Sequence, residues 1–300
     1  MRAVGIDLGG TNIKAGAVDA QGRILERRSI PTGLADGAQA VIARMAGLAR
    51  ELGIEGPLGV GSPGLIDAAG GRILECPNLH DLQEVPLRDE LARHLGIDSS
   101  RVVLENDANV AALGEHWLGA GRGVDDVLVV TLGTGVGGGL VLGGKLYSGP
   151  GGMAGEIGHI VVDPSGPRCG CGRLGCLETL ASATAAQKRA LAVGLPRVSP
   201  GNLEQLAEAA RAGAGPEREL LHAIGLDLGR GLAAAVSLLD LRTFVLGGGF
   251  GAAADALEPG VRQGLQERSY GRRLAQVRVV PAGLGSDAGW IGAARLAMTR

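Results

Sequence analysis

Residues 3–18 read Ala3-Val-Gly-Ile-Asp-Leu-Gly-Gly-Thr-Asn-Ile-Lys-Ala-Gly-Ala-Val18, an apolar run, a polar glycine turn and a second apolar run. Short apolar runs on either side of turn residues predict two strands that pair as a hairpin. The pattern returns later in the chain, where the run Val127–Thr131 is followed by a glycine-rich turn at 132–139 and the run Leu140–Leu142. We interpret these units as a weak internal repeat of one phosphate-gripping hairpin.

Strands and helices alternate along the rest of the chain. Apolar runs predict strands at residues 22–30, 58–60, 102–104, 243–246 and 277–280. Helical periodicity predicts helices at 39–52, 87–95, about 107–117, within 202–240, at 252–266 and at about 289–300. This alternation is typical of α/β architecture, and the hairpins make the sheets mixed. We expect two α/β domains, residues 1–106 and 107–288, with the last helix packing back onto the first domain.

Composition narrows the classes of function. The 29 basic residues are scattered and the net charge is −2, so we expect no nucleic-acid or membrane partner. No apolar run approaches the roughly eighteen residues of a membrane span, because Asp240 and Arg242 interrupt the longest candidate. The first twenty residues carry Asp7 and Asp19, which argues against a signal peptide. A cytoplasmic protein is therefore expected.

Two nucleotide-binding signatures match in part and are rejected. Gly133–Gly138 fits G-x-G-x-x-G, but this fingerprint opens a helix, whereas the following run reads as a strand. Gly139–Lys145 fits most of a Walker A loop, but Leu146 stands where the magnesium-binding hydroxyl belongs.

The hairpin tips themselves suit phosphate. Successive glycine N–H groups form an anion nest, and Thr11 and Thr134 add hydroxyl groups. Asp7 is placed to hold Mg²⁺ through water, and Lys14 either neutralises phosphate or is a solvated strand lysine. One glycine hairpin alone is usually a tight turn, but two hairpins and a third glycine run favour a nucleotide site. The candidate nucleotide-binding residues are Asp7, Gly9, Gly10, Thr11, Asn12, Lys14, Thr131, Gly133, Thr134, Gly135, Gly247, Gly248 and Gly249.

Three of the four cysteines stand in Cys169-Gly-Cys-Gly-Arg-Leu-Gly-Cys-Leu-Glu178, ten residues after Gly155-Glu-Ile-Gly-His159. Thiolates spaced in a glycine-rich segment are typical of a tetrahedral zinc knuckle, and His159 is the nearest fourth ligand. Four protein ligands leave no open position for water, which favours structural zinc over a zinc hydrolase. Glu156 and Glu178 are acceptors suited to a polyhydroxylated ligand.

An acidic corner, Leu104-Glu-Asn-Asp-Ala-Asn109, joins a predicted strand to a predicted helix. Asp107 is either the N-cap of that helix or a general base that takes a proton from an attacking alcohol. The separate polar groups at Glu156, His159 and Glu178 favour the base, and they leave Asn106 as a ligand for a sugar hydroxyl.

Together these motifs, with the closing Asp287-Ala-Gly289, resemble the ROK family (repressors, open reading frames and sugar kinases) of the actin and sugar-kinase superfamily. The likeness covers nearly the whole chain. It implies an actin-like, ribonuclease H-like fold of two α/β domains around a central cleft. ROK repressors carry a helix-turn-helix before the first strand, and the strand starting at residue 3 predicts none here.

The resemblance also implies roles for individual residues. It makes MgATP the phosphoryl donor, a hexose the acceptor and Asp107 the catalytic base. The implied sugar ligands are Gly64, Asn78, Asn106, Asp107, Glu156, His159 and Glu178. The implied ligands of structural zinc are His159, Cys169, Cys171 and Cys176. His159 would give one ring nitrogen to zinc and offer the other to the sugar.

The expected activity is that of a glucokinase, which converts D-glucose to glucose 6-phosphate. Kinases for N-acetylmannosamine, fructose or allose are alternatives, because one or two pocket contacts separate isomers. A non-catalytic sugar sensor is the alternative from another class. Family members are often dimers or tetramers, so a homo-oligomer is expected.

Overall fold

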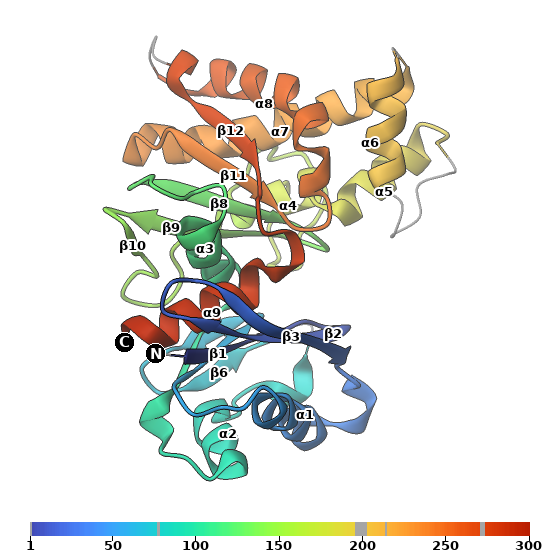
Figure 1. The fold of residues 1–300 in the computed structure, drawn as a ribbon. Helices are drawn as coiled ribbons and strands as arrows, with labels where there is room; N and C mark the ends of the chain where they lie inside the picture. The colour runs from blue at the N-terminus through green and yellow to red at the C-terminus, as the bar shows by residue number, and fades with distance from the viewer. Residues whose placement is uncertain (1, 77–78, 196–202, 214, 271–273) are drawn as a thin grey trace.

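Two five-stranded mixed sheets form the framework of the protein (Figure 1). They are seen in a computed structural model that describes residues 2–76, 79–195, 203–213, 215–270 and 274–300. The first sheet has the order β3-β2-β1-β4-β7, with the bounds Ile24–Pro31, Asn12–Asp19, Arg2–Leu8, Leu58–Ser62 and Val102–Asn106. The second has the order β10-β9-β8-β11-β12, with the bounds Lys145–Leu146, Val136–Leu142, Val127–Leu132, Thr243–Gly247 and Arg278–Pro281.

The two sheets share one topology. In each, the central strand (β1 or β8) pairs antiparallel with the next strand of its hairpin and parallel with a later strand on its other side. A further parallel strand, β7 or β12, forms the outer edge. The repeated hairpin in the sequence is therefore confirmed as a repeat of the whole sheet pattern, and the α/β prediction with mixed sheets is confirmed with it.

Helices surround both sheets and fill the space between them (Figure 1). The helices are α1 Ala38–Glu51, α2 Leu87–Leu95, α3 Asp107–Leu118, α4 Leu177–Ala181, α5 Ala183–Ala192, α6 Leu203–Ala212, α7 Pro216–Leu239, α8 Ala254–Arg268 and α9 Ala288–Thr299. Helices α3 and α9 lie between the two sheets and pack on each other. Helix α3 contacts β8 and β9, whereas α9 contacts β1 and β4. A Cβ at Gly292 would lie 1.7 Å from the carbonyl oxygen of Val110, so this close crossing requires glycine.

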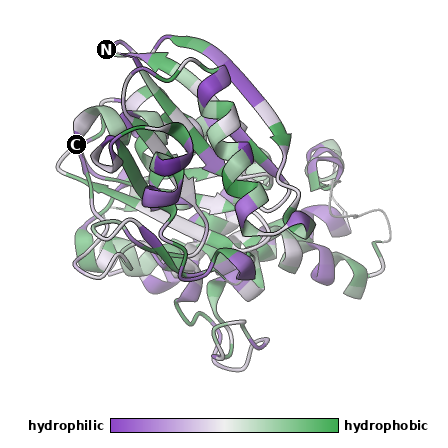
Figure 2. Ribbon diagram, turned by 90° about the horizontal axis from the view of Figure 1, so that it is seen from below, coloured by the Kyte–Doolittle hydropathy of each residue, from purple (hydrophilic) through white to green (hydrophobic). Residues whose placement is uncertain are grey.

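Each half has its own hydrophobic core. In the first, α1 places Val41, Ile42 and Met45 against the sheet, where they are fully buried or nearly so. The helices in Figure 2 carry both hydrophobic and hydrophilic stretches, as expected for elements with one face on a sheet and the other toward solvent. In the second half, α7 and α8 pack on each other and bury Leu228, Leu232 and Leu257.

The length and apolar composition of helix α7 do not agree with the expectation that no segment could span a membrane. Among the described residues it is the one helix long and apolar enough, by length and composition, to do so. In its most apolar stretch, 56 % is buried inside the protein, where it packs against α4, α5, α6 and α8. Burial in the core of the second half accounts for this apolar composition.

The second glycine turn is shorter than the sequence predicts. Strand β9 begins at Val136, so the turn occupies only Gly133–Gly135. A Cβ at Gly139 would lie 2.5 Å from the carbonyl oxygen of Ala108, so this strand glycine lets α3 pack closely instead of meeting a ligand. Because a strand follows the turn, the rejection of the dinucleotide fingerprint is confirmed.

Some short elements, among them β10, were not anticipated from the sequence. The short hairpin of β5 (Leu65–Asp67) and β6 (Arg72–Glu75) lies beyond β4. Helices α4 and α5 follow the cysteine segment, and Ser182 caps α5 by accepting from the N–H of Ala185 at 3.0 Å.

Candidate active site

A cavity of about 390 Å³ lies where the two halves meet. Residues from β1, β2, α3, β8, β11 and α9 line it. It brings together seven residues that the sequence singled out, namely Asp7, Lys14, Asp107, Thr131, Gly247, Gly248 and Gly249. It also includes residues to which the sequence analysis assigned no role in a site, namely Ala108, Ala111, Glu115, Val129, Ala282, Gly285, Ser286, Ala288 and Gly289.

Asp7 lies near the carboxyl end of β1, directly opposite Lys14 on β2. Burial is the main cause that raises the pKa of Asp7 to about 7; the nearby charge of Asp107 acts in the same direction and Lys14 in the opposite one. A Cβ at Gly289 would lie 2.6 Å from the carboxyl carbon of Asp7, so glycine at the start of α9 makes room for the carboxylate. Lys14 Nζ donates to the carbonyl oxygen of Ser286 at 3.4 Å.

The raised pKa of Asp7 predicts a dependence of stability on pH. The folded protein binds a proton at Asp7 up to about pH 7, whereas the unfolded chain releases it near pH 3.8. The free energy of unfolding should therefore fall as pH rises from about 4 to 7, by up to about 4 kcal/mol for this group.

An Asp7→Asn variant removes this contribution. In buffer without Mg²⁺ or nucleotide, urea unfolding should give similar stabilities at pH 4.5 and a more stable variant at pH 8. A variant that is less stable than the wild type at pH 8 would contradict the raised pKa of Asp7.

Asp107 is the first residue of α3, and it is not the cap of this helix. Asn106 is the N-cap, because its side-chain oxygen accepts from the N–H groups of Ala108 at 2.9 Å and Asn109 at 3.2 Å. Asp107 accepts from the N–H of Ala108 at 2.8 Å, and burial raises the pKa of its carboxyl group, with a smaller contribution from the charge of Glu156. A half-buried carboxylate on a cavity wall, with a raised pKa and no capping role, has the environment of a general base.

Asn106 has a second structural contact. Its Nδ2 donates to the carbonyl oxygen of Gly64 at 3.0 Å, which joins the start of α3 to the loop after β4. Gly64 has φ +95°, and a Cβ there would lie 2.0 Å from the carbonyl oxygen of Glu75. Asn78 lies outside the described residues.

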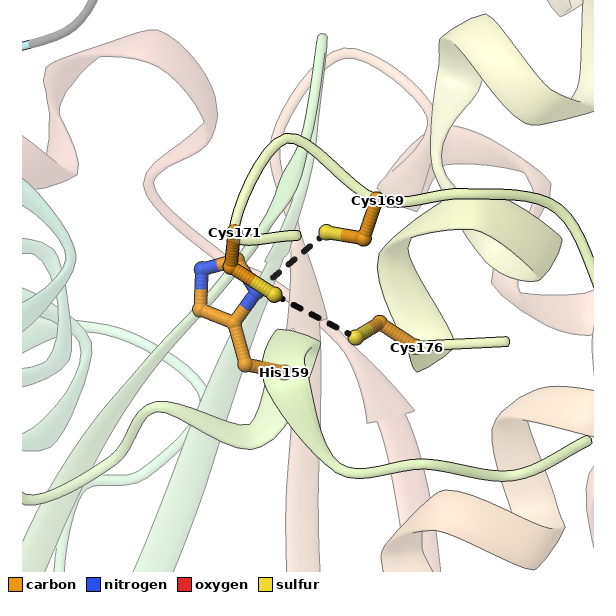
Figure 3. Close-up of side chains that lie close together, drawn as sticks. All are labelled: His159, Cys169, Cys171 and Cys176. Carbon is orange, nitrogen blue, oxygen red and sulfur yellow. Dashed lines mark hydrogen bonds between the residues drawn. The ribbon is translucent and has the colours of Figure 1, made fainter. Parts of the chain in front are cut away.

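The side chains of His159, Cys169, Cys171 and Cys176 converge on one point (Figure 3). Their ligand atoms all lie within 4.8 Å of one another. Cys171 Sγ and Cys176 Sγ are 3.6 Å apart, and Cys169 Sγ is 3.6 Å from His159 Nδ1. Sulfur atoms bound to tetrahedral zinc at about 2.3 Å are separated by about 3.8 Å, so the cluster fits Zn²⁺. The backbone N–H of Arg173 is the main cause that lowers the pKa of Cys171 to about 7.

Two glutamate side chains, Glu156 and Glu178, lie next to the metal cluster. His159 directs Nδ1 to the sulfurs and leaves Nε2 at 3.9 Å from Glu156 Oε2. Glu178 lies in the first turn of α4, two residues after Cys176, and its Oε1 is 3.6 Å from Cys169 Sγ. A metal here would therefore fix the backbone that carries Glu156, His159 and Glu178.

The ROK family model matches residues 3–300. This chain belongs to the ROK family. It is 38 % identical to the glucokinase of Thermotoga maritima over 315 residues, which cover 100 % of this chain and 98 % of that protein. It is 35 % identical to the N-acetylmannosamine kinase of Escherichia coli O1:K1 / APEC, over 99 % and 98 % of the two chains. A ROK family glucokinase from Streptomyces griseus, solved in complex with glucose and AMPPNP, matches with a TM-score of 0.83 and 36 % identity over 100 % of both chains.

The fold of this ROK protein is thus the actin-like sugar-kinase fold, as predicted. The two hairpin tips lie outside the residues that line the cavity, which separates Gly9, Gly10, Thr11, Asn12, Gly133, Thr134 and Gly135 from the other nucleotide-site candidates. The N–H of Gly9 donates to the carbonyl oxygen of Asn12, and the N–H of Gly133 donates to the carbonyl oxygen of Gly135, each at 3.0 Å. These two N–H groups therefore already have hydrogen-bond acceptors within their own turns. Gly135 lies beside Glu178, which accepts from the N–H of Val136 at 3.2 Å.

Glu115 is a buried residue of the ROK site that the sequence did not reveal. Its carboxylate accepts from the N–H groups of Ala120 and Gly283 at 2.9 Å and of Leu284 at 2.8 Å. It thereby ties α3 to the turn that precedes Ser286 and α9. The available signal was a glutamate that directly follows the apolar stretch Val110–Gly114 of the helix, together with the glycines of residues 283–289.

Proposed function

We propose that this ROK protein is an ATP-dependent hexose kinase that phosphorylates D-glucose at the 6-hydroxyl group, that is, a glucokinase. The observation that carries the proposal is the half-buried carboxylate of Asp107, which does not cap α3 and shares one cavity with Asp7 and the glycine run 247–249. The full-length likeness to the glucokinases of Thermotoga maritima and Streptomyces griseus supports glucose as the acceptor.

Asp107 is the general base of the proposed reaction. Its carboxylate accepts the proton of the 6-hydroxyl group as that oxygen attacks the γ-phosphorus, and ADP leaves. Once it has lost its proton, Asp7 would have the charge that suits Mg²⁺ held through water, and Lys14 lies opposite it on β2. Mg²⁺ bound with ATP neutralises charge on the transferring phosphoryl group.

The sugar side of the proposed site is the segment braced by zinc. The sugar hydroxyl groups would donate hydrogen bonds to the carboxylates of Glu156 and Glu178 and form a hydrogen bond with His159 Nε2. The remaining proposed sugar ligands are Asn106, Gly64 and Asn78. The glycines at 247–249, with Thr131, line the nucleotide side. The tips at 9–12 and 133–135 approach phosphate only when the halves close over the substrates, which also excludes water.

The principal rival function is an N-acetylmannosamine kinase, because the relative from Escherichia coli is nearly as similar over the full length. Fructose and allose remain alternative acceptors within the same chemistry. We further propose the domains 1–106, joined by α9, and 107–288, a cytoplasmic location, and a dimer or tetramer. The packing of α9 on β1 and β4 supports the domain assignment.

A sugar panel tests the proposed function. Purified protein with MgATP is given D-glucose, N-acetylmannosamine, fructose, mannose or allose, and ADP release is measured. We expect saturable turnover, with the highest kcat/KM for glucose. A higher kcat/KM for N-acetylmannosamine would replace the acceptor, and a folded, zinc-loaded protein that is silent with every sugar would favour a sensor.

A further inference from the structure

Glu105 is a buried carboxylate that the proposed mechanism does not use. Its side chain is 2 % exposed, and it stands at the carboxyl end of β7, two residues before Asp107. Burying a carboxylate is costly unless hydrogen bonds compensate for the lost water. Its partners therefore show what the residue holds in place.

Both oxygens of Glu105 have defined partners. Oε1 accepts from the backbone N–H of Asn106 at 3.0 Å and from Nδ2 of Asn109 at 3.1 Å. Oε2 accepts from Oγ of Ser148 at 3.0 Å and lies 3.8 Å from the guanidinium group of Arg300. One oxygen thus holds the start of α3, and the other reaches a different segment of the chain.

Ser148 begins the loop that leads to Glu156. Its carbonyl oxygen accepts from the N–H of Ala154 at 3.0 Å, which closes the loop on itself two residues before Glu156. Between them, Gly155 has φ +90° and packs against Gly138, where a Cβ would lie 2.4 Å from the Gly138 carbonyl oxygen. A short chain of contacts therefore runs from the β7–α3 junction through Glu105 and Ser148 to Glu156.

We propose that Glu105 is a positioning residue that fixes the base Asp107 and the sugar-side residue Glu156 relative to each other through Ser148. The inference rests on the proposed hexose kinase function, because it assigns these two residues to one reacting centre. It predicts that loss of the Glu105–Ser148 bond weakens binding of the sugar. Binding of the nucleotide should change little, since neither Glu105 nor Ser148 lines the cavity that contains Asp7 and Gly247.

Three variants test the proposal, namely Ser148→Ala, Glu105→Gln and the double variant. For each, the glucose Kd by calorimetry, kcat, the KM values for glucose and MgATP, and Tm are measured. Loss of a hydrogen bond to a charged group should weaken glucose binding and raise the glucose KM by about tenfold in Ser148→Ala. The KM for MgATP should stay within about twofold of the wild-type value, because Ser148 does not line the cavity of the nucleotide-site candidates and sites that share no contacts behave independently. Glu105→Gln replaces the charged bond to Ser148 by a neutral one and Ser148→Ala removes it, so the effects of the two changes should be less than additive in the double variant.

Ser148→Thr keeps the hydroxyl group and should restore the glucose Kd, which a space-filling role of Ser148 would not produce. A lowered Tm with an unchanged glucose Kd and unchanged KM values would overturn the proposal. Equal changes in the KM values for glucose and MgATP would also overturn it. So would fully additive effects of Ser148→Ala and Glu105→Gln in the double variant. Wild-type protein that binds glucose without turning it over would refute the kinase function, whereas the Kd ratios would still decide the role of Glu105. Wild-type protein that binds no glucose would overturn both.

Discussion

An Asp107→Ala variant should lose at least about a hundredfold in kcat with glucose and MgATP, the lower range for removal of a general base. The glucose hydroxyl would then attack with no carboxylate to take its proton. Binding should persist, because Glu156, His159 and Glu178 are unchanged and the cap of α3 is Asn106. Steady-state kinetics, with glucose binding measured by calorimetry, separate the two effects.

Two further variants are controls for that loss of activity. Asp107→Asn keeps an acceptor for the N–H of Ala108 but is not a base, so it should lose as much activity as Asp107→Ala. Asp125→Ala removes an exposed carboxylate in the loop before β8 and should retain wild-type kcat. Wild-type turnover in Asp107→Ala would exclude Asp107 as the base.

A Cys176→Ser variant should lose zinc and much of its stability. Cys176 is fully buried and is the N-cap residue of α4, so its sulfur joins the metal cluster to the helix that carries Glu178. Loss of a structural metal is among the changes that cost more than about 4 kcal/mol, which corresponds to a Tm lower by about 10 °C. Metal analysis and thermal unfolding of the two proteins measure both effects.

Cys76→Ala is the matched control, because Cys76 is equally buried but lies outside the cluster. It should keep one zinc per chain. If Cys176→Ser or a chelator removed the zinc and left a protein with wild-type Tm and no turnover, the metal would be catalytic instead of structural.

The sequence predicted most of the framework because its signals are local. Hairpin glycines, apolar runs and the bounds of α2 at Leu87–Leu95 follow from residues that are neighbours in the chain. The β5–β6 hairpin was missed because its strands, Leu65–Asp67 and Arg72–Glu75, are too short to show alternation. Gly137–Gly139 were assigned to a turn, but they lie in β9, where the missing side chains let α3 and the backbone at Gly155 pack closely. This requirement comes from contacts between distant segments, so it cannot be recognised locally in the sequence.

The candidate site was predictable to a similar extent. The cysteine spacing identified the metal cluster, because all four ligands lie within 18 residues of one another. Asp107 and its neighbours left two interpretations open, and only the hydrogen bonds of Asn106 show which residue caps α3. Glu115 and Ser286 were missed because they meet the cavity through contacts between distant segments.

We expect this protein to transfer the γ-phosphoryl group of ATP to the 6-hydroxyl group of glucose. The most direct measurement mixes purified protein with MgATP and D-glucose and quantifies ADP and glucose 6-phosphate in the same sample over time. The two products should appear in equal amounts, and the formation of both should depend on Asp107. ADP without glucose 6-phosphate, or a phosphate on another hydroxyl group, would contradict it.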